Sequence, residues 1–235
     1  MKRIVILSGA GISAESGLKT FRDSDGLWEN HNVYDVATPE AFERNPELVI
    51  NFYNERRHQV LEAKPNQAHL ALVELESQFD VRIITQNIDD LHERAGSSHV
   101  LHLHGEIDFA RSSVDETLIY PLNGADIKLG DRCEKGSQLR PHIVWFGEAV
   151  PMMEEVIPLV EMADILLIIG TSLAVYPAAG LVNYVPPFAE KFYIDPNGLD
   201  GVNIHDFTII PKTAGEGVPS LVKQLMNKKG IEPSD

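Results

Sequence analysis

The sequence predicts an α/β fold: a Rossmann-like parallel sheet with helices on both faces, plus a small inserted module. Two observations carry this prediction. Short, largely apolar runs alternate along the chain with helix-length amphipathic stretches, and strands that are apolar throughout are typical of a parallel sheet covered on both faces. A glycine-rich turn also follows the first apolar run directly, as in folds that bind nucleotides at the end of a strand.

The expected elements follow this alternation along the chain. Apolar runs predict strands at residues 4–7, 81–85, 100–103, 143–146, 165–170 and 192–194. Helical periodicity predicts helices near residues 39–62, 68–77, 152–163 and 217–227. Two segments interrupt the pattern and are the candidates for the inserted module. Residues 30–64 are mostly helical, and residues 106–140 are polar, without clear periodicity and rich in Asp, Gly and Ser.

Composition limits the classes of protein to which the chain can belong. Its 235 residues are 43% hydrophobic, enough for one buried core with a small additional module. The longest apolar run, residues 165–169, is far shorter than the roughly 20 residues of a membrane span. A formal charge of −15 argues against non-specific nucleic-acid binding, and the single cysteine, Cys133, excludes an intrachain disulfide. We therefore expect a cytoplasmic protein that binds neither nucleic acid nor membrane.

The glycine-rich turn spans residues 8–22, Ser-Gly-Ala-Gly-Ile-Ser-Ala-Glu-Ser-Gly-Leu-Lys-Thr-Phe-Arg. Gly9 and Gly11 permit a sharp turn and a close approach of the backbone to a pyrophosphate. Ala14 stands where a dinucleotide-binding loop has its third small residue. The N–H groups at the start of a following helix would favour the anion. The pattern Gly-x-Gly-x-x-Ala alone is equally consistent with a tight turn that binds nothing.

Two further motifs follow the ends of neighbouring predicted strands. The first is Thr-Gln-Asn-Ile-Asp-Asp-Leu-His at residues 85–92, and the second is His-Leu-His-Gly-Glu at residues 102–106. Because ligands of open parallel sheets lie beyond the carboxyl ends of the strands, these side chains can meet at one site. Amides and a carboxylate suit a ribose and a carboxamide, and a histidine beside them suits general base catalysis. Taken singly, Asn87 and Asp89 are also typical of turns or helix caps, and His102 of a packed strand residue.

With these motifs in this order, the chain resembles the sirtuins, the NAD-dependent protein-lysine deacylases, whose first motif is Gly-Ala-Gly-x-Ser-x-x-Ser-Gly-x-x-x-Phe-Arg. The resemblance extends from about residue 4 to about residue 225. It implies that NAD is a consumed co-substrate and that the acyl oxygen of a modified lysine displaces nicotinamide from the ribose. His104 would then take a proton from a ribose hydroxyl, so that this oxygen can attack the acyl carbon. The products would be nicotinamide, free lysine and O-acyl-ADP-ribose.

The resemblance also assigns roles to individual residues. The implied catalytic residues are His104, Asn87 and Asp89. The implied cofactor-binding residues are Gly9, Ala10, Gly11, Ile12, Ser13, Glu15, Ser16, Phe21, Arg22, Trp28, Gln86, Asn87, Ile88, Asp89, Gly170, Thr171, Ser172, Asp195 and Ala214, although the family more often has asparagine at residue 195. Residues 139–148 resemble the segment that pairs with the backbone of the acylated peptide by strand addition, which gives the substrate contacts Val144, Trp145, Phe146 and Gly147. An ordinary buried strand is the alternative for this segment.

By the same resemblance, the chain has two domains and a tail. Residues 1–29, 65–105 and 141–228 form an NAD-binding Rossmann-like domain. Residues 30–64 and 106–140 form a small domain with a helical part and a degenerate zinc module, and residues 229–235 form the tail. The expected partners are acylated-lysine segments of other proteins.

Tyr53 and Arg56 indicate which acyl group is removed. They form a Tyr-x-x-Arg sequence and lie three residues apart, on one face of a predicted helix. A subset of sirtuins binds the carboxylate of succinyl- or malonyl-lysine with this sequence, and a guanidinium can grip a carboxylate through two hydrogen bonds. We therefore expect a desuccinylase or demalonylase that can also accept acetyl-lysine. The alternative is a packed tyrosine beside a solvated arginine.

The sequence departs from the family at the zinc site. Sirtuins of this type hold zinc with two Cys-x-x-Cys pairs, and a structural zinc needs four ligands. This chain has Cys133 alone, and the first pair would fall near Arg111 and Ser112. We therefore expect no zinc or other metal. In its place we expect the module to be held by the packing of Phe109, Leu118, Ile119, Tyr120 and Leu122.

Two other functions remain open at this point. An ADP-ribosyltransferase or NAD glycohydrolase would use the same activation of the ribose, and it would release nicotinamide without deacylating a peptide. A module that only binds NAD or ADP-ribose is disfavoured, because His104, Asn87 and Asp89 are all present.

Overall fold

A six-stranded parallel sheet forms the centre of the larger part of the molecule. The structure, a computed structural model, describes residues 1–19, 27–28, 31–198 and 204–229. The strands lie in the order β11 (Thr208–Ile210), β10 (Glu190–Ile194), β9 (Ile165–Ile169), β1 (Arg3–Ser8), β4 (Asp80–Thr85) and β5 (Val100–His102), and every neighbouring pair is parallel. The predicted α/β class with a Rossmann-like sheet is confirmed.

The strand order reverses at β1. The chain first runs outward from β1 through β4 to β5, and it later returns to the other side of β1 for β9, β10 and β11. In the register, Ile4 therefore faces Val81 on one side and Ile165 on the other. Loops on the two sides of such a reversal diverge at the carboxyl ends of the strands, where they leave a crevice for a ligand.

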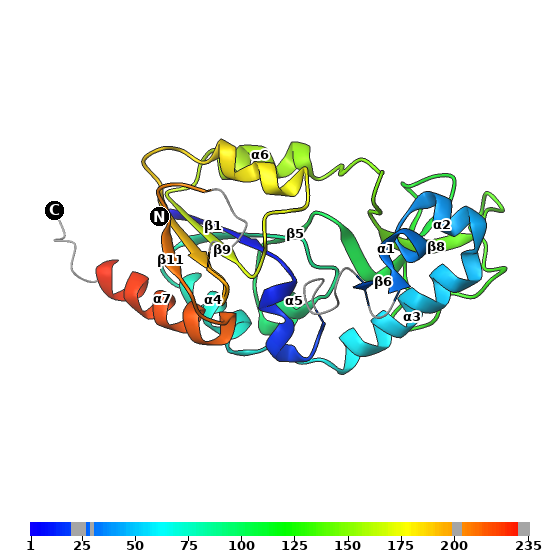
Figure 1. Ribbon diagram of the computed structural model, residues 1–235, viewed down its shortest axis with the longest axis horizontal. Helices are drawn as coiled ribbons and strands as arrows, with labels where there is room; N and C mark the ends of the chain where they lie inside the picture. Colours follow the sequence, from blue (N-terminus) through cyan, green and yellow to red (C-terminus); the bar gives the residue numbers. More distant parts are fainter. Residues whose placement is uncertain (20–26, 29–30, 199–203, 230–235) are drawn as a thin grey trace.

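Both faces of the main sheet are covered, and alternate residues of β1 pack on opposite faces. Ile4 and Ile6 pack in a core with α4 (Gln67–Leu75) and α7 (Ala214–Lys229). Val5 and Leu7 pack in a second core with α6 (Met153–Val160) and the 3-10 helix η4 (Ala178–Tyr184). Figure 1 shows α6 on one side of the sheet and α4 with α7 on the other. The apolar character of the strands therefore reflects burial on both faces.

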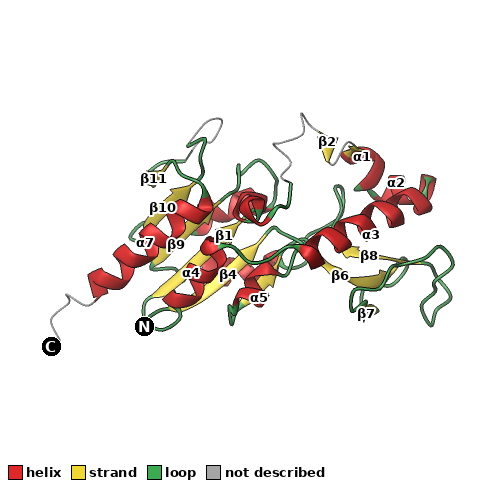
Figure 2. Cartoon of the chain, turned by 90° about the horizontal axis from the view of Figure 1, so that it is seen from below, coloured by secondary structure: helices red, strands yellow, loops and turns green. Residues whose placement is uncertain are grey.

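The inserted part contains helices and a second, smaller sheet. Its elements are the helices α1 (Val33–Val36), α2 (Pro39–Arg44) and α3 (Pro46–Glu62), the antiparallel sheet β7 (Ile119–Pro121), β6 (Gly105–Ser112) and β8 (Leu139–Ile143), and the short pair β2 (Leu27–Trp28) and β3 (His31–Asn32). Figure 2 shows β6, β7 and β8 beside α3, away from β9 and β10. Another short helix, α5 (Leu91–Ala95), follows the loop after β4.

Two expected elements differ in the structure, and one strand of the main sheet is additional. The helix expected at residues 39–62 is divided at Asn45, which has φ −150° and caps α3 by accepting the N–H of Leu48. Pro46 has no N–H to donate and disfavours helical backbone at the residue before it. The strand expected at residues 143–146 instead spans Leu139–Ile143 and belongs to the small sheet. The three-residue strand β11 was not expected.

A buried polar network attaches α3 to the module. Asn54 accepts the N–H of Ile127 at 3.1 Å and donates to its carbonyl at 2.8 Å. Arg57, fully buried, donates to Asn54 at 2.7 Å and to the carbonyl of Ile107 at 2.9 Å. The prediction that Ile119 helps to hold the module by packing is wrong, because this residue is 44% exposed. Ile50, Ala110 and Ile127 form the apolar cluster there, with only Leu122 of the expected set packed against it. The helices also bear on the membrane question. In the described part of the chain, none is both long and apolar enough to cross a membrane.

Candidate functional site

A cavity of about 430 Å³ lies between the main sheet and the inserted part. It is lined by the loops after β1, β4, β5, β8, β9 and β10, by one face of α3 and by the start of α7. The sequence-predicted residues that line it are Gly9, Ala10, Gly11, Ser13, Glu15, Tyr53, Arg56, Gln86, Asn87, Ile88, Asp89, His104, Val144, Trp145, Phe146, Gly147, Gly170, Thr171, Ser172, Asp195 and Ala214. The cavity therefore joins the carboxyl edge of the parallel sheet to the inserted part, as the reversal at β1 requires.

The glycine loop packs tightly against the end of β9. A Cβ on Gly9 would lie 2.7 Å from the Cβ of Thr171, and a Cβ on Gly11 would lie 2.6 Å from the Cα of Gly170. The N–H of Gly11 donates to the carbonyl of Gly170 at 2.8 Å. The expected α-helix start does not follow. The chain forms two short 3-10 helices instead, η1 (Ala10–Ile12) and η2 (Ala14–Ser16). Both glycines are thus needed for the contact between this loop and the loop after β9, independently of any role in phosphate binding.

Ser13 joins the two polar motifs at the base of the cavity. Its hydroxyl donates to the Asp89 carboxylate at 3.0 Å and accepts the Asn87 amide at 3.1 Å. Asp89 also accepts the N–H of Leu91 at 3.2 Å. Burial raises the pKa of Asp89 above its ordinary value, although these hydrogen bonds act in the opposite direction. Asp89 thus bonds to the main chain two residues further on, as in a turn, whereas the Asn87 amide bonds to Ser13. Both residues lie in the wall of the cavity.

The imidazole of His104 has one nitrogen fixed by the main chain. Its Nδ1 lies 3.0 Å from the carbonyl oxygen of Gln86. Because a carbonyl can only accept, Nδ1 carries the hydrogen and Nε2 has the lone pair of a base. Burial lowers the pKa of His104, which favours the neutral form. Gly105 follows at φ +79°, and a Cβ there would lie 2.0 Å from the carbonyl oxygen of His142, so only glycine fits behind this histidine.

His102 is a hydrogen-bonded strand residue, as expected. Its Nδ1 lies 2.9 Å from the carbonyl oxygen of Asn87, and its Nε2 lies 2.9 Å from the Glu93 carboxylate. Burial alone would lower the pKa of His102, but Glu93 raises it above the ordinary value. The His102 side chain therefore holds the main chain of the loop at Asn87.

Tyr53 and Arg56 approach the cavity from α3. Both side chains line it, and Arg56 as a residue is only 8% exposed. The Arg56 guanidinium carbon lies 4.9 Å from the ring centroid of Phe52, and the carboxylate of Glu55, at 3.8 Å, is exposed to solvent. The hydroxyl of Tyr53 accepts the indole N–H of Trp145 at 3.0 Å. Arg56 is thus a buried cation in a cavity wall, whereas the alternative interpretation required a solvated arginine.

The segment after β8 borders the cavity as a loop, and its main chain is largely occupied. The N–H of Val144 donates to the carbonyl of His104 at 2.9 Å, and that of Phe146 donates to the carbonyl of Ala37 at 3.0 Å. The N–H of Trp145 donates to the Glu148 carboxylate at 2.8 Å. Strand addition of a peptide along this segment would therefore use its carbonyls and the backbone around Gly147.

The far end of the cavity lies at β10 and α7. Asp195, 3% exposed, follows β10, and Ala214 begins α7. Glu15 of the glycine loop accepts the N–H of Gly215 at 2.6 Å and the hydroxyl of Thr213 at 3.2 Å. Hydroxyl, amide and carboxylate groups thus extend from His104 to α7, and this set fits the ribose hydroxyls and amide groups of a dinucleotide.

Two predicted cofactor residues that the structure describes, Ile12 and Ser16, do not line the cavity. Ile12 is fully buried in the core of the main sheet, and the Ser16 hydroxyl accepts a hydrogen bond from Asn66 at 3.0 Å. Phe21 and Arg22 lie outside the described residues, and only the backbone of Trp28, in β2, is described.

Several lining residues were missed by sequence reasoning: Gln59, Val60, Glu148, Val175, Tyr176, Asn197 and Thr213. A signal existed for two of them. Gln59 lies three residues after Arg56 on the same helix face, and Glu148 directly follows Gly147, the last predicted substrate contact of the peptide segment.

The thiol of Cys133 belongs to a small hydrogen-bonded cluster in the inserted part. The thiol of Cys133 lies 3.1 Å from the hydroxyl of Ser137 and 3.5 Å from that of Ser112, and the two hydroxyls are 2.8 Å apart. One thiol and two hydroxyls do not fit a structural zinc, which takes four thiolate or imidazole ligands. Within residues 1–19, 27–28, 31–198 and 204–229, no three His, Cys, Asp or Glu side chains gather as metal ligands.

Fold and cavity together define an α/β protein of the nucleotide-binding kind, with the imidazole of His104 in the cavity wall. The chain belongs to the Sir2 family, whose model matches residues 9–177. It is 54% identical over 231 residues to an NAD-dependent protein deacylase of Bacteroides thetaiotaomicron, which covers 96% of this chain and 98% of that protein. It is 53% identical over 226 residues to an NAD-dependent protein deacylase of Helicobacter pylori, again with 96% and 98% covered.

Solved structures give the same result. A complex of a Sir2 homologue with NAD superposes with a TM-score of 0.87 at 39% identity and covers 97% of this chain and 90% of that one. A complex of a Sir2 protein with a p53 peptide and NAD superposes with a TM-score of 0.75 at 32% identity and covers 97% and 94%.

Proposed function

We propose that this chain removes succinyl and malonyl groups from protein lysines, as a specialised form of the NAD-dependent protein-lysine deacylation that its family and relatives support. The observation that carries the proposal is the position of Arg56. Its guanidinium is buried in the wall of the cavity that also contains His104, one helical turn from Tyr53. A buried guanidinium that faces a binding site is stabilised by a planar anion such as a carboxylate.

NAD, when bound, supplies a ribose carbon from which nicotinamide can leave and a neighbouring hydroxyl that must lose its proton. His104 is suited to accept that proton, because Nδ1–H is held by Gln86 and Nε2 remains basic. Asn87 and Asp89, fixed by Ser13, would orient the ribose and the carboxamide. Phe21 and Arg22 keep the roles that the family implies, shielding the reactive centre and ordering the loop.

Further parts of the proposal concern the setting of the reaction. The substrate would be an acylated segment of another protein, bound along residues 144–147. The enzyme would work in the cytoplasm. It would need no structural zinc, because Ser112, Cys133 and Ser137 bond to one another in the part of the chain where the resemblance places the family's metal ligands. The division into an NAD-binding domain and a small domain, at the boundaries given above, belongs to the same proposal.

Mass spectrometry of succinyl-lysine and acetyl-lysine peptides, with and without NAD, tests the proposal. Arg56→Met should reduce desuccinylation by roughly tenfold or more, because a charge-assisted pair of hydrogen bonds is lost. Deacetylation should fall far less. Arg56→Lys is the matched control, since it keeps the charge without the planar group and should retain part of the desuccinylation.

Three outcomes would contradict the proposal. Equal losses of both activities in Arg56→Met would make Arg56 structural. Nicotinamide release without deacylation would favour an ADP-ribosyltransferase or NAD glycohydrolase. Stoichiometric zinc in the same purified sample, measured by elemental analysis, would overturn the zinc-free module.

A further inference from the structure

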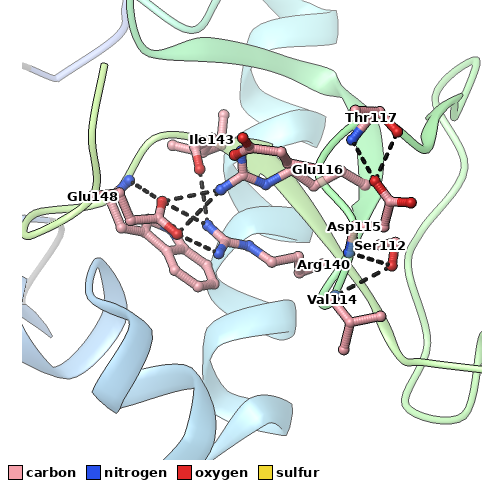
Figure 3. Close-up of polar contacts among 10 residues, drawn as sticks. Ser112, Val114, Asp115, Glu116, Thr117, Arg140, Ile143 and Glu148 are labelled. Atoms are coloured by element: carbon pink, nitrogen blue, oxygen red, sulfur yellow. Dashed lines mark hydrogen bonds and ion pairs between the residues drawn. The ribbon is translucent and has the colours of Figure 1, made fainter. Parts of the chain in front are cut away.

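One carboxylate, that of Glu148, fixes the segment that closes the acyl end of the cavity. Its oxygens accept hydrogen bonds from the Arg111 guanidinium at 3.1 Å and from the Arg140 guanidinium at 2.6 and 3.1 Å. One of them also accepts the N–H of Trp145 at 2.8 Å. Figure 3 shows Glu148 meeting Arg140 beside the carbonyl of Ile143. Both arginine side chains are 8% exposed, so the two strands β6 and β8 hold this loop from within the protein.

Arg140 in turn fixes the indole of Trp145. Its guanidinium donates to the carbonyl of Ile143 at 2.9 Å, and its central carbon lies 3.2 Å from the centroid of the Trp145 ring. The ring of Phe42 lies 5.4 Å from the same indole, centroid to centroid. Trp145 is 2% exposed. A ring confined by a paired guanidinium and a second aromatic ring has little rotational freedom.

The indole then sets the direction of the Tyr53 hydroxyl. Its Nε1–H donates to the phenol oxygen at 3.0 Å. An indole N–H can only donate, so the phenol must accept here and its own hydrogen points elsewhere. Tyr53 is fully buried, and desolvation keeps its pKa well above the ordinary value, so the phenol stays protonated. Tyr53 lines the cavity beside Arg56, where a protonated phenol is a hydrogen-bond donor.

We propose that Trp145 is a specificity-determining residue and that Arg140 and Glu148 are its positioning residues. Together they aim the hydroxyl of Tyr53 at the carboxylate of an acidic acyl group held by Arg56. The inference rests on the proposed function, because that carboxylate is the ligand which the hydroxyl would recognise. It adds that the module determines acyl selectivity through side chains from β6 and β8.

Trp145→Phe tests the hydrogen bond directly, because it keeps an aromatic ring on Arg140 and removes the N–H. The ratio of kcat/KM for succinyl-lysine peptide to that for acetyl-lysine peptide should fall about fivefold, mainly through the KM of the succinyl peptide. Tyr53→Phe should lower the ratio by a similar factor, and the double variant should lower it no further. An unchanged ratio in Trp145→Phe, or additive losses in the double variant, overturns the inference.

Glu148→Gln tests the positioning role with a spectroscopic measurement that needs no substrate. The emission of Trp145, obtained by subtracting the spectrum of Trp145→Phe from that of the parent protein, should shift, and the acyl selectivity ratio should fall. Glu116→Gln is the matched control: Glu116 lies 3.8 Å from Arg111 and is exposed, so neither quantity should change. If Glu148→Gln does not fold, Arg140→Lys carries the same measurement. Equal emission in the test and control variants overturns the role of Glu148.

The same data separate this inference from the proposed function. A wild-type enzyme without preference for the succinyl peptide would remove the proposed function, and the inference with it. A preference that is lost in Arg56→Met but kept in Trp145→Phe and Tyr53→Phe would leave the proposed function intact and overturn the inference alone.

Discussion

At the scale of single residues, the proton on His104 is placed by one main-chain carbonyl. The hydrogen bond from Nδ1 to Gln86, 3.0 Å long, leaves Nε2 as the basic nitrogen. The same loop is held by His102, which bonds to the carbonyl of Asn87. The two histidines of this motif therefore differ: His104 lines the cavity with a basic nitrogen, and His102 supports the loop that carries Asn87.

The burial of His104 gives a prediction for the pH dependence of the reaction. A general base is active when deprotonated, and burial lowers the pKa of His104 below its ordinary value of 6.5. The acid limb of kcat/KM should therefore have its midpoint below pH 6.5, with activity rising as pH increases through it. Acetyl-lysine peptide is the right substrate for this measurement, because its acyl group does not titrate.

Two controls accompany this measurement. His104→Tyr should abolish deacylation while NAD binding remains measurable, and circular dichroism should show folded protein at each pH used. A midpoint at or above 6.5, or near-normal turnover in His104→Tyr, would contradict the role of His104 as the base.

At the scale of elements, the N-terminus of α4 supports the glycine loop. The Asn66 side chain caps the helix by accepting the N–H of Ala68 at 2.9 Å, and His69 accepts the N–H of Asn66 at 3.3 Å. The Asn66 amide also donates to the carbonyl of Ile12 at 2.7 Å and to Ser16 at 3.0 Å. Asn66 thus caps the start of α4 and also fixes the glycine loop that lines the cavity.

Asn66→Ala and Asn66→Ser separate these two functions. Asn66→Ala should lower the free energy of unfolding by about 1 kcal/mol through loss of the cap, measured by urea denaturation. Asn66→Ser keeps a capping oxygen and should recover most of that stability. Both variants should bind NAD more weakly by calorimetry, because neither has the side-chain amide that reaches Ile12 and Ser16. Normal NAD affinity in both would show that the hydrogen bonds to the loop are not needed for binding.

Five of the six strands of the main sheet, all but β11, were predictable because their signal is local. Runs such as residues 4–7 and 165–169 are apolar throughout and are buried on both faces, so composition and burial agree. The segment at residues 143–146 is equally apolar, yet only Ile143 lies in a strand, and the next three residues line the cavity. Apolar composition therefore does not distinguish a strand in a sheet core from a loop in a cavity wall, where Phe146 is 40% exposed.

The same limit applies to the site. Motifs at strand ends indicated Gly9, Asn87 and His104 because a parallel sheet brings its carboxyl ends together. Sequence could not reveal Arg111 and Arg140 as partners of Glu148, since that contact depends on the pairing of β6 with β8 and on the return of the following loop. Long-range pairs between charged residues leave no periodic signal.

At the scale of the whole molecule, main-chain hydrogen bonds join the two sheets around the cavity. The N–H of Ile107 donates to the carbonyl of Ile88 at 2.9 Å, and the N–H of Val144 donates to that of His104, also at 2.9 Å. Both acceptors belong to the polar motifs of the site. Main-chain hydrogen bonds thus couple the position of the small sheet to the loops that carry Ile88 and His104.

The stability of the molecule should depend on two buried histidines behind the glycine loop. His69 and His92 are fully buried, with ring centroids 5.0 Å apart, and His92 bonds to the hydroxyl of Ser8 at 2.9 Å. Desolvation lowers the pKa of His69 from 6.5 to about 4, and it lowers that of His92 well below 6.5. Neither ring can take up a proton in the folded state without a cost.

The sign of the effect follows from proton binding. Between pH 6.5 and about 4 the unfolded chain binds more protons than the folded one at His69, so stability falls as pH falls through this range. The loss from this residue is on the order of 3 kcal/mol. Urea denaturation of the parent protein from pH 7.5 to 4.5 should show the decline.

His69→Gln keeps a side chain that can complete the capping box and removes one titrating group. Its stability should therefore change less steeply with pH than that of the parent protein, while His92 still contributes. Parallel pH profiles for the two proteins would show that His69 is not one of the groups whose protonation unfolds the molecule.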